Sequence, residues 1–144
     1  MNFPVSADSV ELLLDTDIVS AMLRRDPRVQ LAAADYQVQF GRFTISAMTR
    51  FEILRGLRAA RAVRRERLFQ AFVANLLILP ITDDIFESAA NVYATLHRQG
   101  RLIPDADLLI GSTALVHGLA LATNNEDDFN RIPGLSVVNW LRPQ

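Results

Sequence analysis

Four carboxylates lie at junctions between expected secondary-structure elements, although they are far apart along the chain. In a parallel α/β sheet the ends of the strands and the starts of the following helices share one edge, which is where ligands usually bind. The four acids can therefore converge there. Two carboxylates about 4 Å apart repel each other by about 4 kcal/mol at an effective dielectric constant of 20, so such a cluster requires raised pKa values or a cation. The four acids are Asp15, Glu52, Asp107 and Asp128.

The chemistry expected of this cluster is hydrolysis of a phosphodiester. The sequence has no cysteine and only two histidines, so the available ligands are mainly oxygens, which favour Mg²⁺ or Mn²⁺ over Zn²⁺. Such an ion can lower the pKa of a bound water and neutralise charge that develops on a phosphoryl oxygen. A cluster of this kind predicts a metal-dependent phosphodiesterase.

Each acid also has a purely structural interpretation. Acids at helix starts cap free N–H groups and oppose the helix dipole, which could be all that Asp107 does. Glu52 could simply pair with Arg55, one turn further on. Asp15 is the hardest to explain this way, because a carboxylate that ends a buried strand has few structural uses. The remaining acids near helix starts are assigned to capping: Asp17, Asp83, Asp84, Glu87 and Asp105.

The elements that must position these acids alternate between strands and helices. Strands are expected at 11–14, 43–46, 77–81, 119–123 and 135–139. Helices are expected at 18–24, at 28–35, from 47 into the seventies, from 83 to Gly100, and at 105–117. Gly56 or the arginine-dense middle can divide the third of these. Pro80 favours an edge position for the third strand. The pattern predicts a single-domain α/β/α sandwich, residues 1–144, with a short parallel sheet and helices on both faces.

Composition is consistent with this picture. The chain has 144 residues, 50% of them hydrophobic and 22% charged, which suits one globular domain. Residues 1–10 lack a signal-peptide pattern, and no apolar run is long enough to cross a membrane. The absence of cysteine excludes disulfides and thiol nucleophiles. We therefore expect a cytoplasmic protein.

Four blocks of sequence resemble the PIN-domain ribonucleases of the VapC toxin type. They are LLDTDIVS at 13–20, ISAMTRFEILRG at 45–56, IPDADLLI at 103–110 and LATNNEDDF at 121–129, the last followed by IPGL at 132–135 and by Asn139-Trp140. The blocks occur in the order of the family and extend over nearly the whole chain.

The resemblance implies a magnesium-dependent endoribonuclease, in which Mn²⁺ can substitute, acting as the toxin of a toxin–antitoxin pair. It implies an RNA substrate, a small antitoxin partner and a homodimer. It also implies metal binding by Asp15 and Asp107, with Glu52 and Asp128 completing the site. Asn125 stands where many relatives carry an acid, whereas Asp128, just before Phe129, matches the acid of the subgroup that reads Thr-Asn-Asn. Either residue could complete the site, and Asp128 is the choice.

One further departure concerns the residue after Thr16, which is usually asparagine in the family and is Asp17 here. The hydroxyls of Thr16, Ser46 and Thr123 fall beside the acids. They could orient water or carboxylates, or they could simply be caps and strand-end hydroxyls.

All fifteen basic residues are arginine, and seven of them, with two glutamates, lie between Arg50 and Arg67. This segment carries a local charge of +5. Arginines 58, 61 and 65 share one helical face. That face could be merely solvated, could contact RNA phosphates, or could bind an antitoxin.

Two other functions fit part of the pattern. In a haloacid-dehalogenase-like phosphatase, Asp15 would be the nucleophile and Asp17 the acid/base, with 126–128 supplying metal ligands. The chain has no lysine to neutralise the phosphoryl group, and this function leaves Glu52 and Asp107 without a task. A non-catalytic RNA-binding module is the second alternative.

Overall fold

A computed structural model describes residues 10–142 of the chain. Both ends of the predicted domain 1–144 therefore lie outside the described residues, as does most of the segment 1–10 that was examined for a signal peptide. The strands are β1 (Leu12–Leu14), β2 (Thr44–Ser46), β3 (Leu77–Leu79), β4 (Ala120–Ala122) and β5 (Val137–Val138). The helices are α1 (Thr16–Leu23), α2 (Pro27–Phe40), α3 (Ala47–Ala59), α4 (Val63–Val73), α5 (Asp83–Arg98), α6 (Asp105–His117) and α7 (Glu126–Phe129).

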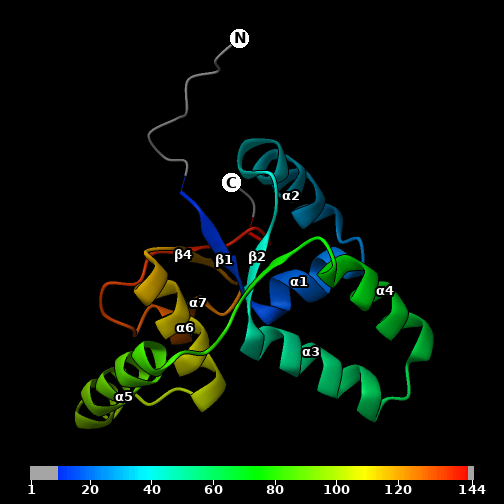
Figure 1. Cartoon of the computed structure of the whole chain (residues 1–144). Coiled ribbons are helices and arrows are strands. Elements are labelled where there is room, and N and C mark those ends of the chain that lie inside the picture. Colours follow the sequence, from blue (N-terminus) through cyan, green and yellow to red (C-terminus); the bar gives the residue numbers. More distant parts are fainter. Residues whose placement is uncertain (1–9, 143–144) are drawn as a thin grey trace.

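The five strands form one parallel sheet in the order β3-β2-β1-β4-β5 (Figure 1). β1 is central, and Leu14 is in register with Ile45 of β2 and Ala122 of β4. β3 is an edge strand, as Pro80 predicts. The expected α/β architecture with a short parallel sheet is confirmed.

Alternation along β1 divides the apolar interior into two cores. Leu12 and Leu14 belong to a cluster shared with α1, α2, α3 and α4, whereas Leu13 belongs to a cluster shared with α5, α6 and α7. Successive side chains of a strand point to opposite faces, so both faces of the sheet are covered. The three leucines are almost fully buried, which explains why β1 reads as a continuous apolar run.

The long helical region divides in its arginine-dense middle and not at Gly56, which lies inside α3. Arg61 adopts a positive φ of 53° between α3 and α4. Such a backbone angle cannot continue a right-handed helix. The two helices consequently form an arm on one side of the molecule (Figure 1).

Some expectations about the helices were wrong. α2 continues to Phe40, five residues beyond its predicted end, and α7 was not predicted. Phe86 and Tyr93 recur in α5 at the spacing of an apolar helical face, but these side chains are 52% and 43% exposed. The buried face is instead formed by Ile85, Ala89, Val92 and Leu96.

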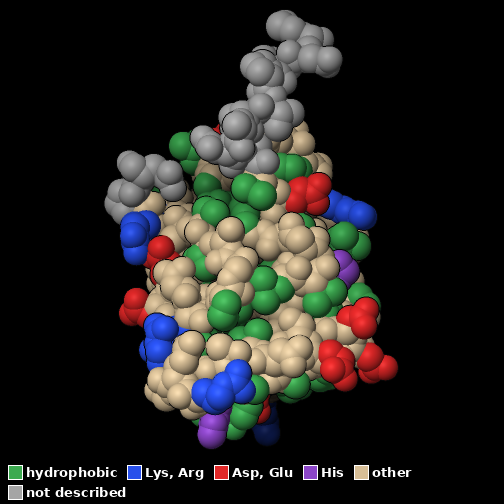
Figure 2. Space-filling model, turned by 90° about the vertical axis from the view of Figure 1, so that its left-hand side faces the viewer, with side chains coloured by type: hydrophobic (Ala, Val, Ile, Leu, Met, Phe, Trp, Pro, Cys, Tyr) green, Lys and Arg blue, Asp and Glu red, His purple; other side chains and the backbone are tan. Residues whose placement is uncertain are grey.

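Figure 2 shows a face of the molecule on which apolar, acidic and basic side chains are mixed.

α6 passes unusually close to its neighbours, at Gly111. A Cβ atom at that position would overlap the side chain of Ile132 and would contact Leu135 and Phe129. The absence of a side chain thus lets α6, which carries Asp107 one turn earlier, approach the segment after α7. Across residues 10–142, no helix is both long enough and apolar enough to cross a membrane.

Candidate active site

The carboxyl ends of β1 and β4 and the first turns of α1, α3 and α6 meet at one edge of the sheet. Asp15 follows β1 directly, and Glu52 lies in the second turn of α3. Asp107 is in the first turn of α6, and Asp128 is in the short helix after β4. Hydrogen bonds connect these acids through a small number of hydroxyl and amide groups, described in turn below.

Asp15 is the most buried of the acids, with 6% of its surface exposed. Its Oδ1 accepts the backbone N–H of Thr16 at 2.8 Å, and its Oδ2 accepts the hydroxyl of Thr123 at 2.7 Å. Asp15 is also the N-cap residue of α1, a role that we had expected of Thr16 or Asp17. This carboxylate is therefore rigidly held between β1 and β4.

Glu52 reaches the same edge from α3. Its Oε1 accepts the hydroxyl of Thr16 at 2.8 Å, and its Oε2 lies 3.6 Å from the guanidinium of Arg55. Ser46 caps α3 as expected, through the backbone N–H groups of Met48 and Thr49. Glu52 thus has the predicted contact with Arg55 and also a direct link to the residue beside Asp15.

Asp107 and Asp128 are bridged by one amide. Nδ2 of Asn125 donates to Oδ2 of Asp107 at 3.3 Å and to Oδ2 of Asp128 at 3.0 Å. Asp128 also lies 3.9 Å from the guanidinium of Arg131. The amide of Asn125 donates to both carboxylates and so offsets part of the repulsion between them.

Asp17 does not serve as the helix cap that we expected. Its Oδ2 accepts the backbone N–H of Asn124 at 2.9 Å, which ties α1 to the turn after β4. Its Oδ1 is buried and has no hydrogen-bond partner among the described residues. Sequence reasoning assigned Asp17 to capping and named Asn125 only as an alternative to Asp128, so it did not anticipate the link from Asp17 to Asn124 or the bridging role of the Asn125 amide. The available signals were the spacing Asp15-Thr16-Asp17 and the pair of asparagines that follows β4.

Burial raises the pKa values of three aspartates at this edge. Burial, followed by the charge of Asp17, raises the pKa of Asp15 to about 7. Burial, followed by the charges of Asp128 and Glu52, raises the pKa of Asp107 to about 6. Burial also raises the pKa of Asp17. The predicted acids therefore share one electrostatic environment, in which the fully ionised state is unfavourable.

Comparison with known proteins identifies the family. A sequence model of the PIN domain matches residues 12–135. The chain is 31% identical over 140 residues to the VapC ribonuclease Y4jK of Sinorhizobium fredii, covering 92% of this chain and 99% of that protein. The chain is a PIN-domain protein of the VapC ribonuclease type. This membership decides against the dehalogenase-like phosphatase.

Two solved structures resemble this PIN domain in fold as well as in sequence. The VapBC-1 structure from nontypeable Haemophilus influenzae has a TM-score of 0.78 and 26% identity, and covers 91% of this chain and 98% of its own. A toxin–antitoxin complex from Klebsiella pneumoniae has a TM-score of 0.67 and 26% identity, and covers 90% and 97%.

The side chains of this PIN domain fit a hard divalent cation by their chemistry. All the candidate ligands are oxygens. The buried Oδ1 of Asp17 has no hydrogen-bond partner among residues 10–142, and an ion or an ordered water could provide one. Within residues 10–142, no three acids or histidines are placed so that they could hold one ion together. The acids share an edge, and binding would require them to move closer to one another.

Proposed function

We propose that this protein is a magnesium-dependent endoribonuclease that acts as the toxin of a toxin–antitoxin pair, with Mn²⁺ as a possible substitute. The observation that carries the proposal is the meeting of Asp15, Glu52, Asp107 and Asp128 at one sheet edge in a VapC-type chain. PIN-domain nucleases of this type depend on a metal. The raised pKa values of Asp15 and Asp107 support a site that a divalent cation would stabilise.

In this proposal Asp15 and Asp107 hold the cation, and Glu52 and Asp128 complete the site. A bound divalent cation supplies an acidified water and neutralises charge on the phosphoryl oxygen. The chain itself supplies the positioning. Thr123 and the N–H of Thr16 fix Asp15, and the hydroxyl of Thr16 orients Glu52.

RNA approaches the acids along the arm formed by α3 and α4. A groove of about 350 Å³ lies between this arm and α1, and Thr16 and Glu52 are among its lining residues. Arg24 and Arg65 also line it, and both side chains are exposed. Arginine side chains beside an acid cluster can hold the phosphates that flank the bond to be cleaved, and they partly offset the repulsion between RNA and the acids.

The antitoxin and the homodimer belong to the same proposal. The Klebsiella pneumoniae structure is described as a toxin–antitoxin complex, and we propose a small antitoxin protein as the partner of this chain. We also propose that the protein is a cytoplasmic homodimer. A short neighbouring reading frame that encodes a DNA-binding protein would support the biological role, and co-expression followed by size-exclusion chromatography would test the complex and the dimer.

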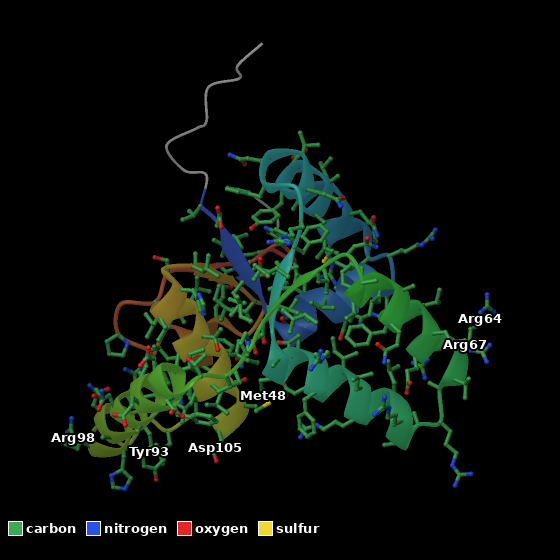
Figure 3. All side chains as sticks on the ribbon, viewed as in Figure 1. Met48, Arg64, Arg67, Tyr93, Arg98 and Asp105 are labelled. Carbon is green, nitrogen blue, oxygen red and sulfur yellow. The ribbon has the colours of Figure 1, made fainter. Side chains whose placement is uncertain are left out.

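The decisive experiment compares two acids of the same helix. The carboxylate of Asp107 accepts the amide of Asn125 in the site. Asp105 is exposed and directed outward at the start of α6 (Figure 3). Purified wild type and the variants Asp107→Asn and Asp105→Asn are incubated with structured RNA, first with Mg²⁺ and then with EDTA. We expect cleavage by wild type and Asp105→Asn in Mg²⁺, and none by Asp107→Asn or in EDTA.

The same experiment separates the nuclease from a non-catalytic module. RNA binding that EDTA leaves unchanged, together with no cleavage by wild type, would indicate a binding module. Cleavage by Asp107→Asn at the wild-type rate would remove Asp107 from the site.

A further inference from the structure

We propose that Asp17 is a positioning residue of the nuclease site, which fastens the turn between β4 and α7 to the start of α1. Through this turn it holds Asn125 between Asp107 and Asp128. The kinetic part of the inference rests on the proposed nuclease function, whereas its structural part does not.

Asp17 lies in the first turn of α1 but does not cap it. Asp15 caps this helix, while Oδ2 of Asp17 accepts the N–H of Asn124, more than one hundred residues further along the chain. The other oxygen is buried without a partner in the described part of the chain. A buried carboxylate with a free oxygen is costly, so the link to Asn124 is the contact that explains its position.

The turn that Asp17 holds is short, and it carries the bridging amide. Asn124 immediately precedes Asn125, whose N–H donates to the hydroxyl of Thr123 at 2.9 Å. The side-chain amide of Asn125 reaches Asp107 and Asp128. A displacement of the backbone at Asn124 would therefore move the amide that bridges these two carboxylates.

Only part of this turn is restrained from elsewhere. The N–H of Thr123 donates to the carbonyl oxygen of Val138, and Nδ2 of Asn139 donates to Oδ1 of Asn124 at 3.1 Å. Both contacts come from the β5 side, and the hydroxyl of Thr123 also donates to Oδ2 of Asp15, the N-cap of α1, at 2.7 Å. Asp17 accepts the backbone N–H of Asn124. Loss of its carboxylate would release this N–H, while Thr123 would stay tied to Asp15 and the sheet would stay intact.

A double-mutant cycle tests whether Asp17 acts through Asn125. The variants are Asp17→Ala, Asn125→Ala and the double variant, assayed with RNA and Mg²⁺ well below their melting temperatures. We expect each single variant to lower kcat by about 10²-fold with little change in KM, because a shift of about 1 Å in a catalytic group has that effect. The kcat of the double variant should be within about twofold of the kcat of the less active single variant. Multiplicative losses would overturn the proposal.

Asp17→Asn tests whether the hydrogen bond or the charge matters. The asparagine oxygen can still accept the N–H of Asn124, so kcat should stay within about threefold of wild type. The affinity for Mn²⁺, measured by electron paramagnetic resonance without RNA, should also stay within about threefold. If Asp17→Asn loses as much activity as Asp17→Ala, or binds Mn²⁺ far more weakly, then Asp17 acts by charge and the positioning role is wrong.

Hydrogen exchange provides a readout that needs no substrate. Deuterium uptake in peptides that cover 123–128 should rise in Asp17→Ala and stay near the wild-type level in Asp17→Asn. Asp84→Ala is the matched control, because Asp84 is an exposed acid at the second position of α5, as Asp17 is in α1. Unchanged uptake in Asp17→Ala would overturn the inference even if the protein proved to have no nuclease activity.

Discussion

The sheet edge that carries Asp15, Glu52, Asp107 and Asp128, here called the acid edge, has two flanks that are held in different ways. On the β1–β4 flank, Asp15 is almost fully buried and accepts hydrogen bonds from a backbone N–H and from the hydroxyl of Thr123. On the α3 flank, the side chain of Glu52 is 20% exposed and is held by the hydroxyl of Thr16 and a longer contact with Arg55. In the proposed nuclease, the buried flank would fix the position of the cation, while the more exposed flank would adjust to the phosphate.

The largest expected effect comes from neutralising the buried flank. Asp15→Asn should lower kcat by about 10³-fold, because a lost cation contact removes several kcal/mol of transition-state stabilisation. Asp35→Asn, at an exposed position of α2, should match the wild type. Measured kcat values with RNA and Mg²⁺ check both. A loss under tenfold in Asp15→Asn would show that the buried flank does not hold the cation.

The pH dependence of stability follows from the same burial. The pKa values of Asp15 and Asp107 are raised to about 7 and about 6 in the folded protein, whereas in an unfolded chain an aspartate titrates near pH 4. The folded state binds more protons between these values, so the stability from these groups is complete below about pH 4 and is lost as the pH rises to about 7.

In EDTA, the melting temperature should therefore fall between about pH 5 and pH 8, and Mg²⁺ or Mn²⁺ should raise it more at pH 8. Asp15→Asn should flatten the slope in EDTA. Scanning fluorimetry provides the measurement. A wild-type melting temperature that rises over this interval would contradict the assigned pKa shifts.

Substitution of one threonine on each flank tests the difference between the flanks directly. Thr123→Val removes the hydroxyl that binds buried Asp15, and Thr16→Val removes the one that binds partly exposed Glu52. A hydrogen bond to a charged group contributes about 1.5–3 kcal/mol, so we expect kcat to fall about 10²-fold for Thr123→Val and about tenfold for Thr16→Val. Equal losses would remove the distinction between the flanks.

The smallest expected effect concerns the arginines of the arm. Arg65→Gln should raise KM for RNA about threefold. It should also make the slope of log K against log[salt] less steep by roughly 0.7, the value expected for one phosphate contact to a single strand. Arg64 and Arg67 project outward from the same helix (Figure 3), so Arg64→Gln is the control. Fluorescence anisotropy at several salt concentrations measures the slopes. Identical slopes for both variants would place the RNA elsewhere.

The sequence predicts much of this fold because its signals are local. The short apolar run before Asp15, the cap at Ser46 and the glycine after His117 each mark the end of an element, and the structure has these boundaries. The shared edge follows from parallel strands alone. The break at Arg61 is less visible, since a positive φ in a non-glycine residue has no clear sequence signal.

The details of the site could not be predicted in the same way. The link between Asp17 and Asn124 joins residues more than one hundred positions apart, and the local pattern assigns Asp17 to capping. The exposed positions of Phe86 and Tyr93 depend on which side of α5 meets α6, and apolar periodicity alone does not decide that. Long-range contacts determine both features.

The missing side chain at Gly111 makes the position of Asp107 adjustable from one turn further along the same helix. A methyl group there would have to displace Ile132, which is 2% exposed and lies against a filled interior. Gly111→Ala should therefore impair the enzyme without touching the acid edge, and Ile132→Val, by making room, should restore part of what was lost. Paired substitutions of this kind would change the activity of the enzyme by repacking the apolar side chains behind α6.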